Sequence, residues 1–284
     1  MALNSINLTS GMRANLYSLQ KTAKDLETTQ QRLATGLRIN NALDDPVKFF
    51  TAQEHRLRAS DLASRKDGMS EAIQTIKAAN VGIEGITNLI AQAKSLASSA
   101  LSASASDAEA FATQFAEVLN QIDTIANDSG YKGVNLLRSG ELTVQFAQSA
   151  DDSVLKLDGF GGATGTFIGS FGAQTTVTTG AGWVDASGEI VASAIESDIE
   201  ALEDANEDLR TESKNLSSDL SIITAREDFT SKMINTLEDG AATLTEADMN
   251  EEGANMLMLQ TRQALGTTSL SLASQAAQSV LRLF

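Results

Sequence analysis

The chain has 284 residues, of which 42% are hydrophobic, 5% are aromatic and one is proline. This composition is typical of long helices and offers few bulky groups for a thick globular core. A formal net charge of −16 argues against nucleic acid as a partner, because phosphate binding needs a basic patch and the 21 Lys and Arg residues form no such cluster. Because the chain has no cysteine, it can form neither a disulfide nor a cysteine-based metal site.

No targeting or membrane signal is visible. Residues 1–13 lack a basic segment followed by an apolar one, and no apolar run reaches the roughly 18 residues of a membrane span. We expect no cleaved signal peptide and no membrane-spanning segment. A protein of this kind that acts outside the cell would leave by a route that reads no cleaved signal.

The first predicted helix covers residues 4–34 and carries an apolar seam with steps of three and four. The seam consists of Leu16, Leu19, Ala23, Leu26, Leu33 and Leu37, with Gln30 in one polar slot. Such a seam must be buried against other helices. Gly36 suits the left-handed position that follows a helix end, so residues 35–46 are predicted to form a connector.

The connector ends in Asp44, Asp45 and Pro46. An Asp before Pro predicts a helix N-cap followed by the first helical position, where the missing N–H of proline costs nothing. A catalytic carboxylate pair is a much weaker interpretation of these two residues. The second helix is predicted to run to about residue 100. Its apolar seam consists of Met69, Ile73, Ile76, Ile83, Ile86, Ile90, Ala93 and Ala97, with Asn80 in a polar slot.

A third helix and a hairpin follow. Ser106, with Glu109 three residues later, is predicted to form the capping box of a helix that ends near residues 127–130. The apolar period then changes to two around Val144, and a second apolar run after residues 149–152 completes a predicted β-hairpin. Residues 159–188 hold nine of the 20 glycines, which predicts short strands and loops.

The fourth predicted helix covers residues 191–238 and ends at Asp239-Gly240. Its seam consists of Ile195, Ile199, Leu202, Leu209, Leu216, Leu220 and Ile223, with Asn206 and Ser213 in polar slots. Residues 239–247 are predicted to form a second connector, with a capping signature at Thr245. The last helix is predicted over residues 248–284. Its seam consists of Leu270, Ala273, Ala277, Val280 and Phe284.

The predicted elements are arranged almost symmetrically about the middle of the chain. The first helix should lie beside the last, and the second beside the fourth, with residues 130–190 at the fold-back point. The predicted fold is mainly α: a long antiparallel helical coiled-coil bundle with a small central β-hairpin and loop region. Residues 1–34 and 248–284 would form one pair of helices, and residues 47–129 and 191–238 a second, longer helical domain. Asn80 and Asn206 lie in seams expected to face each other, where buried asparagines fix the register of helices.

Three segments resemble bacterial flagellin. Residues 31–45 (QRLATGLRINNALDD) are similar to the family signature ERLSSGLRINSAKDD, and residues 130–137 (GYKGVNLL) resemble the FNGVKLL motif. Residues 254–256, 263–266 and 273–284 (ANM, QALG and ASQAAQSVLRLF) are similar to the family's C-terminal QAGTSVLAQANQ…VLSLL. The two chain ends look more like alphaproteobacterial than enterobacterial members. The resemblance covers about the first 140 and the last 90 residues.

The resemblance implies an extracellular filament subunit for bacterial motility. It implies an inner tube made from the terminal helices, which order on polymerisation, and an outer tube of longer helices. The implied partners are other copies of the chain, an export chaperone on the C-terminal helix, the hook-associated junction and cap proteins, and the flagellar type III export apparatus. Neither a cofactor nor an enzymatic activity is expected.

We assign three sets of residues to these roles. The polymerisation seam comprises Leu16, Leu19, Leu26, Leu33 and Leu37 with Leu270, Ala273, Ala277, Val280 and Phe284. The connector comprises Gly36, Asp44, Asp45 and Pro46. The helical-domain core comprises Ile73, Ile76, Ile83, Ile90, Ile199, Leu202, Leu209, Leu216 and Leu220.

One family motif has degenerated in this chain. In the family, a Gln-Arg-x-Arg-Glu-Leu stretch of the second helix contacts a vertebrate innate receptor. The corresponding residues 91–96 read Ala-Gln-Ala-Lys-Ser-Leu, in which Gln92 and Ser95 replace a charged arginine and glutamate while Lys94 and Leu96 follow the pattern. The loss of two charged contacts predicts weak or absent receptor activation.

Other functions remain as alternatives. A hook–filament junction protein is the main rival, because the Asp44-Asp45-Pro46 motif also occurs in that group. A generic coiled-coil scaffold accounts poorly for the β insert and for the different chain ends. An enzyme lacks supporting residues: His55 is the only histidine, so neither a zinc site nor His-based nucleophilic catalysis is credible.

Overall fold

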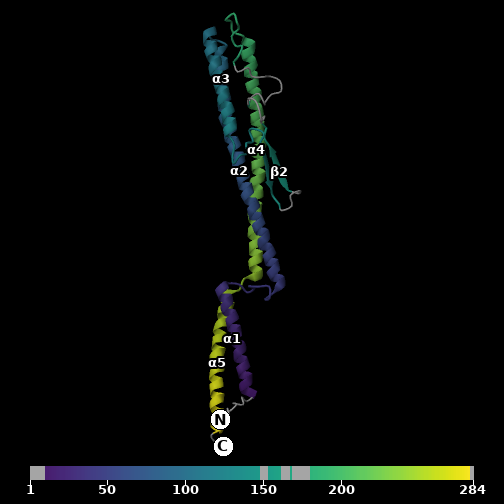
Figure 1. Ribbon diagram of the computed structural model, residues 1–284, viewed down its shortest axis with the longest axis vertical. Coiled ribbons are helices and arrows are strands. Elements are labelled where there is room, and N and C mark those ends of the chain that lie inside the picture. Colours follow the sequence, from purple (N-terminus) through teal and green to yellow (C-terminus); the bar gives the residue numbers. More distant parts are fainter. Residues whose placement is uncertain (1–9, 148–152, 161–166, 168–179, 282–284) are drawn as a thin grey trace, which may run out of the picture. The chain divides into compact units, whose positions relative to one another are not determined.

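The computed structural model describes residues 10–147, 153–160, 167 and 180–281. The elements within these residues are α1 (Ser10–Thr35), α2 (Pro46–Ala100), α3 (Ala105–Asp128), β1 (Glu141–Gln145), β2 (Val154–Asp158), α4 (Ala192–Thr245) and α5 (Met249–Leu281). The predicted class is confirmed: the fold is mainly helical, with long antiparallel pairs and a small two-stranded hairpin in the middle (Figure 1). The predicted helix start at residues 4–9 and Phe284 lie outside the described residues.

The chain divides into two compact units. Residues 1–58 and 236–284 form one, called here the terminal unit, in which α1 lies beside α5. Residues 59–235 form the other, called the central unit, which contains α3, the hairpin and most of α2 and α4.

Within the central unit, α2 and α4 run antiparallel. Four polar pairs join them, and the residue number falls along α4 as it rises along α2: Lys66 with Ser231, Ser70 with Glu227, Asn80 with Ser213, and Lys94 with Glu203. This order fixes the register over more than six turns of helix. It also places the apolar seams of the two helices face to face.

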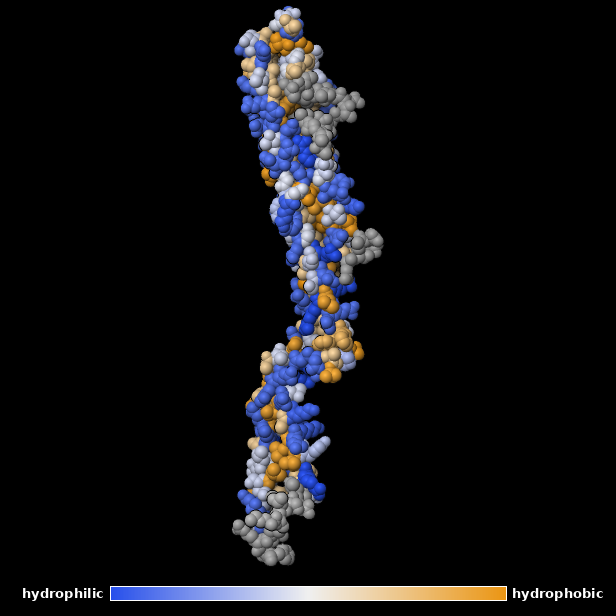
Figure 2. All heavy atoms as spheres, in the orientation of Figure 1, coloured by the Kyte–Doolittle hydropathy of each residue, from blue (hydrophilic) through white to orange (hydrophobic). Residues whose placement is uncertain are grey.

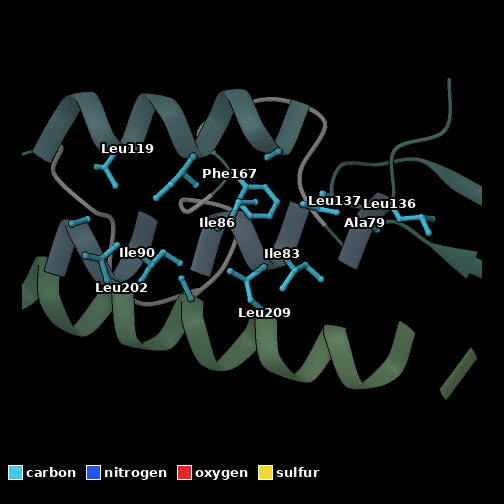
Figure 3. Packing of buried hydrophobic residues seen from close by; sticks show 14 of the residues in the cluster. Ala79, Ile83, Ile86, Ile90, Leu119, Leu136, Leu137, Phe167, Leu202 and Leu209 are labelled. Atoms are coloured by element: carbon cyan, nitrogen blue, oxygen red, sulfur yellow. The ribbon is translucent and has the colours of Figure 1, made fainter. Parts of the chain in front are cut away.

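The central core repeats every seven residues, which is the period of helices that wind around each other. The buried residues at this spacing are Met69, Ile76, Ile83, Ile90 and Ala97 on α2, and Leu202, Leu209, Leu216 and Ile223 on α4. Figure 3 shows Ile90 close to Leu202, and Ile83 close to Leu209. The structure also buries Ile73, and it packs the half-buried Ile199 and Leu220 against the same cluster.

The hairpin and the glycine-rich insert complete this core. The strands β1 and β2 pair antiparallel, with Leu142 opposite Leu157, as the change of period predicts. A lone hairpin is marginally stable, so its docking on helices is required. Arg65 donates to the Gln145 side-chain oxygen at 2.7 Å, and the Arg226 guanidinium lies 5.4 Å from the ring centre of Phe146.

Two aromatic side chains from the insert lie fully buried against the helices, a feature that sequence patterns did not indicate. The centre of the Trp183 ring lies 4.8 Å from the centre of the Phe115 ring on α3. The Trp183 indole N–H donates to the buried Asp198 carboxylate at 2.8 Å. The Phe167 backbone N–H donates to Asp123, and Figure 3 shows its ring beneath α3 near Ile86. Part of the insert is therefore core, rather than surface loop.

Both predicted features of the first connector are present. Gly36 has φ +71°, the left-handed conformation expected after a helix end, and its N–H donates to the Arg32 carbonyl at 2.8 Å. The Asp45 carboxylate accepts the Lys48 backbone N–H at 3.1 Å and so caps α2, whose first residue is Pro46. That hydrogen bond is the main cause of a lowered pKa for Asp45. The cap is therefore fully present above the ordinary Asp pKa, and its contribution is lost as the pH falls below it.

Two predicted caps are wrong by a few residues. The N-cap of α3 is Ser104, whose hydroxyl accepts the Asp107 N–H at 3.3 Å, and Ser106 lies within the helix. The Ser104 carbonyl accepts the Ala108 N–H at 2.8 Å, and this first intrahelical bond places the helix start before Ser106. The N-cap of α5 is Asp248, which accepts the N–H groups of residues 250 and 251, whereas Thr245 belongs to α4.

The predicted helix end at Gly240 is also wrong. The helix α4 continues to Thr245, so most of the predicted connector 239–247 is helical. A glycine inside a helix costs about 1 kcal/mol, which tertiary packing can offset. Here Ala241 and Thr245 are buried, and the Thr245 hydroxyl accepts from Arg56 at 3.1 Å.

The two asparagines in polar slots do not pair with each other. The Asn80 side-chain oxygen accepts from the Ser213 hydroxyl at 3.3 Å. The Asn206 oxygen is buried and has no hydrogen-bond partner among the described residues. The antiparallel register explains the difference, since it brings Ser213 rather than Asn206 opposite Asn80.

Replacing Asn206 by Leu should raise the free energy of unfolding by about 1 kcal/mol, because a buried acceptor without a partner destabilises the folded state. Chemical denaturation followed by circular dichroism measures this change. Asn80→Leu is the matched control and should give equal or lower stability, since it leaves the Ser213 hydroxyl without its acceptor. Lower stability for Asn206→Leu would contradict the assignment.

Candidate assembly surface

The helices α1 and α5 pack along one row of side chains each. On α1 the innermost positions are Thr22 and Thr29, which are buried, and Leu19, Leu26 and Leu33 are half-buried beside them. Steps of three and four separate these five residues, so they share one face. The Thr22 hydroxyl donates to the Ser18 carbonyl at 2.9 Å, which allows its burial.

The predicted seam on α1 is therefore only partly the packed row. Leu16 is 41% exposed and Ala23 is exposed, because both lie on the neighbouring row of the helix. Leu37 lies beyond the helix end and forms an isolated β-bridge with Glu246. Helical spacing alone does not distinguish two adjacent rows when one of them contains threonines.

On α5 the packing depends on a close approach at Gly266. A Cβ atom at this position would lie 2.9 Å from Leu19 Cδ2, closer than carbon atoms approach in practice. Leu270 and Ala273 are half-buried farther along the helix. The side chains of Ala277 and Val280 and the whole of Phe284 lie outside the described part of the chain.

An ion pair and paired connectors hold the other end of these two helices together. Arg32 Nη1 lies 2.9 Å from Glu252 Oε1. The Glu252 side chain is nearly buried, and its other oxygen has no partner among the described residues. The Arg38 N–H donates to the Thr245 carbonyl at 2.7 Å, and the Ala247 N–H donates to the Gly36 carbonyl at 3.0 Å.

The terminal unit has almost no closed apolar core. Among its described residues, the buried apolar ones are Ile39, Ala52 and Ala241. Of fifteen exposed large apolar side chains in the described chain, eleven belong to this unit, and Figure 2 shows apolar surface over α1 and α5. The eleven are Leu16, Tyr17, Leu43, Val47, Phe50, Leu57, Met249, Leu257, Met258, Leu265 and Leu272.

The described residues contain neither a membrane-spanning helix nor a cluster of metal ligands. No described helix has the length and apolarity needed to cross a bilayer. Within the same residues, no group of three or more histidines and carboxylates is arranged to hold a metal ion. In the degenerate receptor motif, Gln92 and Ser95 are exposed, Lys94 forms an ion pair with Glu203, and Leu96 packs against the core.

These features define a class of helical structural protein with a closed central core and a terminal helix pair that leaves apolar rows in water. Comparison with known families is consistent with that class. The N-terminal helical region of bacterial flagellin matches residues 6–141, and its C-terminal helical region matches residues 199–284. The chain therefore belongs to the bacterial flagellin family. It is a structural subunit that polymerises into the extracellular flagellar filament, and it is not an enzyme.

Full-length relatives support the same assignment. The chain is 29% identical to flagellin FljK of Caulobacter vibrioides over 294 residues, covering 100% of both proteins. It is 29% identical to a flagellin of Brucella melitensis, and 24% identical to flagellin C of Rhizobium meliloti, with 99% of each protein covered. These relatives are alphaproteobacterial, as the chain ends predict. A crystal structure of Bacillus cereus flagellin is similar with a TM-score of 0.45 at 17% identity, over 57% of this chain and 88% of that one.

Replacing Gly266 by Val should weaken the packing of α1 on α5, because the added side chain would overlap Leu19. We expect the critical concentration for seeded filament growth to rise about tenfold, equivalent to about 1.4 kcal/mol. Light scattering of growing filaments provides the measurement.

The matched control is Gly253→Val, since this glycine is also on α5 but has nothing within 4 Å of its Cβ position. Its critical concentration should stay within about twofold of that of the unaltered protein. Equal behaviour of the two variants would contradict the close approach.

Proposed function

We propose that the terminal unit of this flagellin orders only when copies polymerise, and that its exposed apolar rows form the polymerisation surface. The observation that carries the proposal is the contrast between the two units: the central one closes its core, and the terminal one has two alanines and one isoleucine as its buried apolar residues. The seam residues Leu16, Leu19, Leu26, Leu33, Leu270 and Ala273 would be covered by neighbouring copies.

The energetic scale supports this order of events. Full burial of one large apolar side chain contributes about 1.5–3 kcal/mol, and the net stability of a whole domain is about 5–15 kcal/mol. Covering a few of the eleven exposed side chains between copies is therefore comparable to the folding free energy of a domain. Two helices that leave these side chains in water gain little from pairing alone.

The same exposure calls for partners before assembly. A chaperone whose groove accepts an amphipathic helix would cover the rows on α5 in the cell. A terminal unit that is poorly ordered would thread through a flagellar type III export channel without a cleaved signal, and the absence of cysteine leaves no disulfide to block its passage. Junction and cap proteins would then contact the two ends of the filament.

The hook–filament junction protein was the main alternative. Both helical-region matches and the full-length relatives favour the filament subunit instead. Purified protein grown from filament seeds and viewed by electron microscopy tests the choice: a filament subunit extends the seeds over micrometres, and a junction protein does not.

Hydrogen exchange should distinguish the two units. In the monomer, backbone amides of α1 and α5 should exchange at least about tenfold faster than those of α2–α4 in the central unit, because their helices lack a closed core. In the filament, both sets should be protected. Mass spectrometry of peptic fragments measures both states, and protection of α1 and α5 in the monomer would refute ordering on assembly.

Activation of the vertebrate innate receptor should be weak or absent. Two charged contacts of the family motif are missing at Gln92 and Ser95, and Lys94 is engaged with Glu203. A receptor reporter assay with purified monomer tests this, with the double variant Gln92→Arg/Ser95→Glu as the restoring control. Strong activation by the unaltered protein at nanomolar concentration would contradict the prediction.

A further inference from the structure

Two exposed rows in the terminal unit carry the same alternation of apolar and charged side chains. On α2, Phe50 and Leu57 lie seven residues apart with Glu54 between them. On α5, Met258 and Leu265 lie seven apart with Arg262 between them. Seven residues are close to two helical turns, so each trio lies along one face of its helix.

Both rows are open to water. Phe50 is 59% exposed and Leu57 is 60% exposed, and the corresponding fractions for Met258 and Leu265 are 52% and 65%. The charged residue at the centre of each row is also exposed. Among the described residues, neither Glu54 nor Arg262 forms an ion pair.

The two rows differ in the charge at their centre, which is negative at Glu54 and positive at Arg262. Contact between two different surfaces of identical molecules builds an open helical chain when the rotation between copies does not close into a ring, and a filament requires such a contact. We propose that the Phe50-Glu54-Leu57 row of one copy docks on the Met258-Arg262-Leu265 row of a second copy, with Glu54 paired to Arg262. This proposal rests on the proposed polymerisation surface and names the two rows that meet in it.

Charge makes this pairing selective. Each copy carries a formal charge of −16, so two copies repel each other on average. An opposite pair framed by apolar side chains favours one docking register and disfavours contacts that bring like charges together. Among the described residues, the central unit has one similar row, where Arg226 lies between Ile222 and Phe229, but that guanidinium already lies over the Phe146 ring.

Exchange of the two charges tests the pairing in the full-length protein. Glu54→Arg alone and Arg262→Glu alone each place like charges opposite one another, and each should raise the critical concentration for seeded growth about tenfold. The double variant Glu54→Arg/Arg262→Glu should return it to within about twofold of the unaltered protein. An equimolar mixture of the two single variants should also grow, because each supplies the charge that the other lacks.

Three controls keep the result specific. Circular dichroism of each monomer should match that of the unaltered protein, which excludes misfolding. Glu207→Arg, at an exposed α4 position, changes net charge as Glu54→Arg does and should leave growth unchanged. Combining Arg226→Glu with Glu54→Arg should give no rescue.

The outcomes separate the two proposals. Normal growth of both single variants, or rescue by Arg226→Glu instead of Arg262→Glu, would overturn the pairing while the polymerisation surface stands. Failure of the unaltered protein to extend seeds would overturn the polymerisation surface and the pairing together.

Discussion

A pair of packed helices buries one row of side chains on each partner, and any further apolar row needs a third element. The central unit has such elements. α3, the hairpin and the two aromatic anchors cover the faces that α2 and α4 leave open, so its seven-residue repeat becomes a closed core. In the terminal unit, the long helices that pack together are α1 and α5, and their other apolar rows are exposed to water. In the polymerisation surface proposed above, neighbouring copies supply the missing third element.

The glycine-rich insert shows how a short central region can still support the helices. Trp183 brings a large apolar ring into contact with Phe115 on α3 and connects to α4 through Asp198. An indole can be fully buried at this point because its N–H finds an acceptor. Phe167 is tied to α3 by its backbone through Asp123. These two described side chains thereby connect the insert to α3 and α4.

Polar groups in the packed rows of the terminal unit also limit its stability. Thr22 and Thr29 occupy the most buried positions on α1, and the nearly buried Glu252 has an oxygen without a described partner. Such groups gain less from burial than leucines would, and a carboxylate is costly to remove from water. These polar contacts thus fix how α1 and α5 align, but they add little to the stability of the pair. That balance agrees with our proposal that the terminal unit orders on assembly.

The sequence by itself determined what depends on strong local rules or on long repeats. The apolar rows from Met69 to Ala97 and from Leu202 to Ile223 predict two helices that pack along one seam, and the fold-back between them predicts that they run antiparallel. Gly36 and Asp45 predict the helix end and the next helix start, since few residues suit those two backbone positions.

Only the tertiary structure decided the choices that local rules leave nearly equal in free energy. Ser104 and Ser106 can both cap a helix, Gly240 costs only about 1 kcal/mol inside one, and the rows through Leu16 or Thr22 have the same helical spacing. Packing of Ala241 and Thr22 decides the second and third of these choices. The hydrogen bond from the Ala108 N–H to the Ser104 carbonyl marks the helix start in the first. The anchors Phe167 and Trp183 follow no period at all, so their burial depends on where the folded helices leave room.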